Sequence, residues 1–305
     1  MLAIVGLITI LLVLASIMTK KLSTMSALIA IPIVACLFLG QGSDLGKYML
    51  AGIKNVAPTG AMFIFAVLFF TILGDAGVFE KIVNKIVGIV GSNPVKVCIG
   101  TYVITMFAHL DGSGAATFLI VIPALLPIYE KLKMDRRILA TIVALGAGTM
   151  NMLPWGGPTL RAATSLDIPV MDLFNPMIVP QIAGMACGIA IAAFFGMKEK
   201  RRLGTELASI SVAPAVLSEE EQVLRRPKLF WFNLILIIVT VALMVEGTLP
   251  PVGCFMAALV VMLIVNYPDV KLQGKLIDAH AKEALMMASV LFAAGIFTGI
   301  MKGSG

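Results

Sequence analysis

Eight long apolar runs limit what this chain can fold into more than any other feature of its sequence. A helix that crosses the hydrocarbon core of a bilayer needs about 20 apolar residues, with a range of about 17 to 25. Only 13% of the residues are charged and the mean hydropathy is +1.01, whereas a soluble domain carries roughly 25% charged residues. The sequence predicts an all-α polytopic membrane protein, with runs at about 2–18, 25–40, 58–74, 137–165, 172–196, 230–246, 252–266 and 284–302.

The placement of Lys and Arg predicts how these runs thread the membrane. Lys20 and Lys21 put the first loop in the cytoplasm and the N-terminus outside, because cytoplasmic loops are rich in basic residues. The run Leu2–Met18 has no basic n-region and no A-x-A site, so we expect a retained span in the cytoplasmic membrane rather than a signal peptide. Of the 23 basic residues, this topology places Arg161 within a span and leaves three outside: Lys47, Lys54 and Lys302.

The net charge of +6 does not indicate a nucleic-acid partner, because the basic residues are dispersed over short loops and form no single patch. The cysteines are far apart in the sequence, each within an apolar run, and none forms a C-x-x-C pair. We therefore expect small packing residues rather than disulfides or metal ligands at Cys36, Cys98, Cys187 and Cys254.

A polar interruption divides the segment 95–130 into two apolar halves. His109 and Asp111 end the first half, and Gly112-Ser113-Gly114 lets the backbone reverse before the second half begins. Each half spans about 24 Å as a helix, short of a core of about 30 Å, which favours a re-entrant hairpin over two full crossings. Polar groups among apolar helices make the tip a candidate functional site.

A second interruption lies within the run 137–165. Pro154 and Pro158 bracket Trp155-Gly156-Gly157, and prolines at this spacing predict a broken helix. Unwound backbone is tolerated at membrane depth only where it meets protein or lines a cavity. The free N–H groups at the helix start near Pro158 favour an anionic ligand. Trp155 itself is expected to pack or to anchor the chain at an interface.

The polar residues at the two interruptions form the candidate site. Asp111 could accept a proton, bind a cation or cap the following helix. His109 could carry the coupled proton, since its ordinary pKa is close to neutral, or act as a buried hydrogen-bonding neighbour. Arg161 could neutralise a substrate carboxylate, snorkel, or pair with Asp167 or Asp172. Four further residues could coordinate substrate oxygens or a cation, or only satisfy the broken backbone: Ser113, Thr117, Asn151 and Thr159.

An internal repeat appears at an offset of 228 residues. The runs 2–18, 25–40 and 58–74 fall on 230–246, 253–268 and 286–302 without a gap. An odd number of crossings separates the copies, so the second should be inverted, as in many secondary transporters. The identities are Gly46-Lys47, Ala51, Lys54, Ala66, Phe69, Ile72 and Gly77, matching Gly274-Lys275, Ala279, Lys282, Ala294, Phe297, Ile300 and Gly305.

The repeat predicts a domain organisation. The first repeat, 1–196, contains scaffold helices within 1–75, an amphipathic helix at 77–90, the hairpin 95–130, the broken helix 137–165 and a helix at 172–196. A cytoplasmic linker, 197–229, precedes a partial second repeat, 230–305, in which His280 is expected to be solvated. Because the second hairpin and broken helix do not follow Gly305, we expect a truncated permease.

The two motifs together resemble those of the CitMHS family, the metal–citrate:proton symporters of the wider ion transporter superfamily. The resemblance rests on His109-Leu-Asp-Gly-Ser-Gly-Ala-Ala-Thr117 and Asn151-Met-Leu-Pro-Trp-Gly-Gly-Pro-Thr159 and extends over essentially the whole chain. It implies an elevator-type transporter, usually a homodimer, that takes up citrate complexed with magnesium or calcium together with protons. The matching site residues are Asp111, Gly112, Ser113, Gly114, Asn151, Pro154, Gly156, Gly157, Pro158 and Thr159.

Other functions remain open at this point. A permease for another carboxylate or oxyanion, coupled to protons or sodium, would suit the same motifs, and so would an inactive membrane subunit. An intramembrane enzyme is disfavoured, because the chain has no H-E-x-x-H motif and no G-x-S-x-G elbow around Ser113. We expect no catalytic residues, no cofactor and no metal held by the protein alone, since the divalent cation would travel with citrate.

Overall fold

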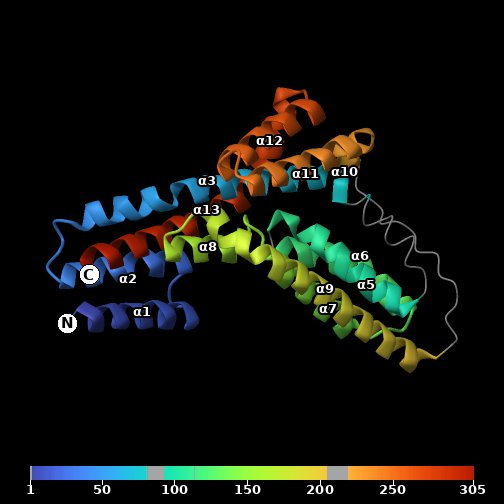
Figure 1. Ribbon diagram of the computed structural model, residues 1–305, viewed down its shortest axis with the longest axis horizontal. Coiled ribbons are helices and arrows are strands. Elements are labelled where there is room, and N and C mark those ends of the chain that lie inside the picture. Colours follow the sequence, from blue (N-terminus) through green and yellow to red (C-terminus); the bar gives the residue numbers. More distant parts are fainter. Residues whose placement is uncertain (1, 80, 82–92, 113, 205–218) are drawn as a thin grey trace.

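The computed structural model describes residues 2–79, 81, 93–112, 114–204 and 219–305, and all of the regular structure in these ranges is helical. Most of the amphipathic helix predicted at 77–90 lies outside them. The elements, shown in Figure 1, are α1 (Leu2–Met18), α2 (Thr24–Phe38), α3 (Leu45–Asp75), α5 (Pro94–Ala108), η1 (His109–Asp111), α6 (Gly114–Lys131), α7 (Arg136–Met150), α8 (Gly157–Leu166), α9 (Val170–Leu203), α10 (Glu219–Leu224), η2 (Pro227–Leu229), α11 (Phe230–Glu246), α12 (Pro251–Asn266) and α13 (Val270–Ser304).

Four segments among the described residues are long and apolar enough to cross a membrane: Leu45–Asp75, Val170–Leu203, Pro227–Glu246 and Val270–Ser304. Shorter apolar helices accompany them, and the prediction of an all-α polytopic membrane protein is confirmed. The helices α3 and α13 extend well before the apolar runs predicted at 58–74 and 284–302, because the preceding amphipathic stretches continue the same helix. The helix α9 likewise runs to Leu203, into the segment expected as linker.

Local sequence signals set several helix starts. The side chain of Asn93 accepts a hydrogen bond from the N–H of Val95 and Pro94 occupies the first turn, so α5 begins with both an N-cap and a proline. Asp135 caps α7 and Asp269 caps α13 in the same way. Each of these side chains bonds a backbone donor that the helix itself leaves unpaired.

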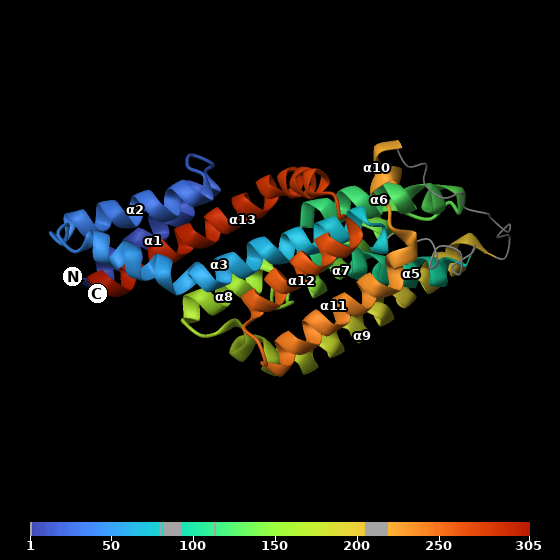
Figure 2. The same ribbon diagram turned by 90° about the horizontal axis from the view of Figure 1, so that it is seen from above.

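The helices α3 and α13 form the central antiparallel pair, and Figure 2 shows them side by side. Their backbones approach closely: a Cβ added to Gly52 would lie 2.8 Å from the carbonyl carbon of Gly295 and 3.1 Å from the Cα of Gly299. Near one end of the pair, Gly303 packs against the ring of Tyr48, and near the other, His280 meets Asp75. Small residues allow such contacts, as in membrane helix packing generally.

The outer helices pack on opposite members of this pair. The helix α12 packs on α3, while α2 packs on α13, and the two flanking pairs α1–α2 and α11–α12 each pack together. An inverted repeat would produce this arrangement. The division into a first repeat, a linker and a partial second repeat stays a prediction.

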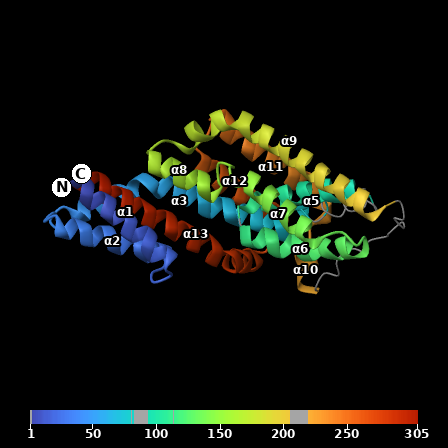
Figure 3. The same ribbon diagram turned by 90° about the horizontal axis from the view of Figure 1, so that it is seen from below.

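The buried apolar residues form two main cores. One joins α3, α8, the start of α9 and the helices α11 to α13, and the other joins α5, α6, α7 and the later part of α9. Figure 3 shows the helices of the second core gathered away from the two termini. The interruption between α7 and α8 lies where the two cores meet, since Trp155 belongs to the first core and Val143 of α7 to the second.

Two side-chain expectations differ from the structure. His280 was expected in solvent, but its Nε2 lies 2.7 Å from Oδ2 of Asp75, with exposed side-chain fractions of 22% and 28%. Proximity of α3 and α13, which sequence periodicity does not report, brings the two together. Of the four cysteines predicted to pack inside, Cys36, Cys98 and Cys254 are buried, whereas Cys187 is exposed on α9.

The close approach of α3 and α13 predicts the effect of adding one methyl group. Gly52→Ala should lower the stability of the full-length protein in detergent by about 1–3 kcal/mol, because the methyl group would overlap backbone atoms that cannot rotate away. Gly274→Ala, in α13 with no atom within 4 Å of its Cβ, is the matched control and should be neutral or slightly stabilising. Thermal unfolding of both variants makes the comparison; equal melting temperatures would contradict it.

Candidate functional site

The hairpin tip is a short, tightly turned segment. The helix α5 ends at Ala108, the single 3₁₀ turn η1 follows, and Gly112 then adopts a left-handed conformation with φ of +76° before α6 begins. A residue with a side chain is strained at this φ, which explains the glycine. The turn η1 contacts α3, α5, α6 and α7. Ser113 and the side chain of Asp111 lie outside the part of the chain that the structure describes.

The interruption between α7 and α8 is also tight. Gly156 is its last residue, and a Cβ there would lie 3.0 Å from both the carbonyl carbon of Asn151 and the carbonyl oxygen of Leu153. Pro158 occupies the first turn of α8, and no side chain caps this helix. Its first N–H groups therefore carry the partial positive charge of an uncapped helix start. Pro154, Gly156 and Gly157 are buried, and the hydroxyl of Thr159 reaches the carbonyl oxygen of Asn151 at 3.4 Å.

His109 joins the two interruptions. Its Nδ1 lies 2.7 Å from Oγ1 of Thr117 and its Nε2 lies 3.0 Å from Oδ1 of Asn151. An amide oxygen only accepts hydrogen bonds, so Nε2 carries a proton, and the Thr117 hydroxyl can donate to Nδ1. A neutral imidazole thus satisfies both partners. The ring is fully buried, and the interpretation of His109 as a hydrogen-bonding neighbour accounts for this geometry, while its part in proton coupling stays a prediction.

Trp155 makes a second connection between the tip and the interruption. Its indole N–H donates to the carbonyl oxygen of Leu110 at 2.7 Å. The ring stacks on Phe70 of α3 at 5.1 Å and meets Phe255 of α12 edge-on at 5.4 Å. Trp155 therefore packs, as the sequence suggested, and at the same time fixes the tip against α3 and α12.

Three polar residues of this region were missed at the level of sequence. The Tyr102 hydroxyl donates to Oγ1 of Thr149 at 3.1 Å, and the Gln181 amide donates to the carbonyl oxygen of Thr149 at 2.9 Å. Thr149 lies in the last turn of α7, where a carbonyl lacks its helical partner. The signal was available, since Gln181 is a polar residue within an apolar run and Gly188 leaves room for Tyr102: a Cβ there would lie 2.6 Å from Cε2 of Tyr102.

Arg161 does not make the ion pair considered for it. Oδ2 of Asp167 lies 2.8 Å from Nζ of Lys302, and its other oxygen accepts from Asn55. These hydrogen bonds, that from Lys302 first, hold the pKa of Asp167 below its ordinary value. Among the described residues no ion pair joins Arg161 to either aspartate, and its side chain is exposed on α8. The pairing with Asp167 is wrong because α13 supplies a nearer cation.

The described residues offer oxygens and N–H groups rather than a metal centre. No three His, Cys, Asp or Glu side chains in the described ranges cluster closely enough to hold a metal ion. The N–H groups of the Asn151 amide and of the start of α8 instead suit an anion with several oxygens.

This arrangement defines the class of protein. A helical hairpin whose tip meets a broken helix, within a bundle of apolar helices, is typical of integral membrane secondary transporters. Comparison with known proteins agrees: the family model CitMHS, described as "Citrate transporter", matches residues 1–305. The chain belongs to the CitMHS citrate transporter family, which consists of transporters rather than enzymes, and both the predicted resemblance and the prediction of no enzymatic activity are confirmed.

Two relatives from Bacillus subtilis (strain 168) cover the whole chain. One, named "Citrate transporter", is 46% identical over 304 residues, which are 100% of this chain and 71% of the relative. The other, named "Mg(2+)/citrate complex secondary transporter", is 43% identical over 308 residues, again 100% of this chain and 71% of the relative. Both similarities include the hairpin tip and the broken helix.

The tight interruption predicts the effect of a methyl group at Gly156. Gly156→Ala should reduce initial citrate uptake by the full-length protein and destabilise it by about 1–3 kcal/mol, because the Cβ would press on the carbonyl groups of Asn151 and Leu153. Gly148→Ala, on the exposed side of α7 with no atom within 4 Å of its Cβ, should leave both uptake and melting temperature unchanged. A Gly156→Ala protein with normal uptake would show that the interruption tolerates a wider turn.

Proposed function

We propose that the protein is a secondary transporter that takes up citrate as a complex with a divalent cation, magnesium or calcium, together with protons. The observation that carries the proposal is the joining of two polar backbone interruptions by His109, Thr117 and Asn151. An uncapped helix start adjoins them and provides N–H groups for a carboxylate. The names of the two relatives supply the chemical identity of the substrate.

Charge supports a metal complex over free citrate. A citrate trianion with a divalent cation has a net charge of −1, so its transfer through an apolar environment requires far less compensation than transfer of the trianion. Of the described residues near the interruptions, Arg161 offers a single positive charge, and no cationic cluster lies there. Magnesium and calcium prefer oxygen ligands, which citrate itself provides in abundance. The metal is thus part of the substrate.

The two separate cores support an elevator-type movement. The core of α5, α6, α7 and the later part of α9 contains no residue of α3, so the proposed movement shifts the hairpin and α7 relative to α3 and has to release the packing of Trp155 on Phe70. We place the protein in the cytoplasmic membrane with its N-terminus outside, on the distribution of Lys and Arg. In line with the family resemblance, we propose that it works as a homodimer.

The metal-complex proposal predicts how uptake depends on free cation. In proteoliposomes that contain the full-length protein, labelled citrate should enter in the presence of magnesium or calcium, and an excess of EDTA should lower the initial rate at least about tenfold. A tenfold lower rate corresponds to about 1.4 kcal/mol. This is a modest estimate of the cost of transporting free citrate, which carries two more negative charges than its metal complex. Magnesium added beyond the EDTA should restore uptake. Equal rates with and without chelator would contradict the metal complex and favour a permease for free carboxylates.

The proposed proton role of Asp111 predicts a division between net uptake and exchange. Asp111→Asn cannot bind or release a proton at the side chain, so uptake driven by a pH gradient should fall to background while citrate–citrate exchange continues. Asp172→Asn, an exposed aspartate at the start of α9, is the matched control and should behave as wild type. Loss of exchange as well would make Asp111 a substrate or cation ligand, and normal net uptake would reduce it to a helix cap.

A further inference from the structure

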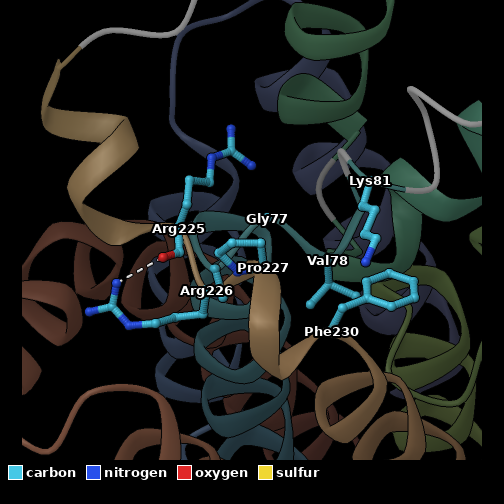
Figure 4. Close-up of a pocket in the computed structure, with 8 residues that line it drawn as sticks. Gly77, Val78, Lys81, Arg225, Arg226, Pro227 and Phe230 are labelled. Atoms are coloured by element: carbon cyan, nitrogen blue, oxygen red, sulfur yellow. Dashed lines mark hydrogen bonds between the residues drawn. The ribbon is translucent and has the colours of Figure 1, made fainter.

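A basic cavity lies where the end of α3 meets the start of α11. It has a volume of about 350 Å³, and its lining includes Gly77, Lys81, Arg225, Arg226 and Phe230, shown in Figure 4. The N–H of Arg226 donates to the carbonyl oxygen of Ala76 at 2.9 Å. This hydrogen bond joins two segments that are far apart in the sequence and that both line the cavity. None of the described residues that line the cavity is acidic.

Two of the lining cations keep their charge uncompensated by carboxylates of the described chain. The ammonium of Lys81 lies 4.4 Å from the ring centroid of Phe230. Arg226 donates from Nε to the carbonyl oxygen of Asn266 at 2.7 Å and from Nη1 to the carbonyl oxygens of Val223 and Arg225. Backbone carbonyls and an aromatic ring orient these cations without cancelling their charge, so the cavity has a positive potential.

Gly77 leaves room at the cavity wall for the side chain of a third cation, Arg225. Its φ is +83°, and a Cβ there would lie 2.8 Å from Nη1 and 2.9 Å from Cδ of Arg225. The Arg225 side chain can lie across this position only because no side chain occupies it. The left-handed turn at Gly77 also separates the end of α3 from Lys81, so that the lysine approaches the cavity from the side facing Phe230.

The cavity is at the boundary of two spans. The candidate span Leu45–Asp75 ends just before Ala76, and the candidate span Pro227–Glu246 begins at the cavity. Trp231, next to Phe230, is 68% exposed, and the two rings meet edge-on at 5.3 Å. Exposed Trp residues at the ends of spans lie at the level of lipid headgroups. The positive cavity therefore adjoins the lipid phosphates rather than open solvent alone.

We propose that this cavity binds the phosphate of an anionic phospholipid headgroup. Basic pockets between membrane spans recognise such headgroups, and a volume of about 350 Å³ is at the lower end of ligand pockets, which suits a headgroup whose acyl chains lie outside along Trp231. The ammonium of Lys81 binds the phosphate oxygens, and Arg226, on the opposite side of Pro227, adds to the positive potential. The bound lipid holds the end of α3 to the start of α11, and it is separate from the citrate site.

The test titrates full-length protein in uncharged detergent micelles with dioleoylphosphatidylglycerol, following thermal unfolding and counting retained lipid by native mass spectrometry. Phosphatidylglycerol should raise the melting temperature and remain bound. Dioleoylphosphatidylcholine, with no net charge, and inorganic phosphate at the same concentration should do neither. Lys81→Gln should weaken the apparent affinity for phosphatidylglycerol about fivefold, the effect of one basic residue near a lipid surface, and Lys81→Arg should retain it.

Lys228→Gln is the matched control. Lys228 is an exposed lysine in η2 that does not line the cavity, so its removal subtracts the same charge from the same end of the span and should leave the affinity unchanged. An equal loss in both variants would overturn the proposal in favour of a diffuse basic surface. Stabilisation by inorganic phosphate equal to that by phosphatidylglycerol would overturn it in favour of a soluble anion, and no preference for phosphatidylglycerol over phosphatidylcholine would exclude a headgroup site.

Discussion

A broken helix in an apolar environment leaves backbone groups that no water can satisfy, and this constraint organises the centre of the molecule. Between α7 and α8 the helical ladder stops, and other segments supply the missing partners. The Gln181 amide donates to the carbonyl oxygen of Thr149, and the Thr159 hydroxyl donates to the carbonyl oxygen of Asn151. Each partner comes from a different helix, so the interruption also determines how α8 and α9 pack.

The hairpin tip faces the same constraint, and the two interruptions satisfy each other. The carbonyl oxygen of Leu110, in the turn η1, accepts from Trp155, and the Asn151 side chain accepts from His109. Neither segment would be stable alone at membrane depth, because each would expose unpaired polar groups. A polar substrate can enter such a place at lower cost than elsewhere, since hydrogen-bonding groups are already concentrated there. The structural solution to an interrupted helix is thus also the basis of the proposed binding site.

The sequence could predict the parts of this site but not all of their partners. Prolines and glycines at Pro154, Gly156 and Pro158 revealed the interruption, because their effect on the backbone is local. The partner of Asp167 could not be found in this way, since Lys302 comes from a helix far along the chain. His280 was misplaced for the same reason: its contact with Asp75 depends on the close packing of α3 and α13. The periodicity of a sequence does not predict which residues become neighbours when helices far apart in the chain pack together.

The helix α3 connects the proposed citrate site with the basic cavity. Phe70 supports Trp155, and Ala76, whose carbonyl accepts from Arg226, lies six residues further on, about 9 Å along the helix axis. The same helix packs through Gly52 against α13 over its other half. A long helix held at both ends makes a rigid support for the elevator movement that we propose. A lipid headgroup at the cavity would secure the end of that support nearer to Trp155, where the N–H of Arg226 donates to the carbonyl oxygen of Ala76.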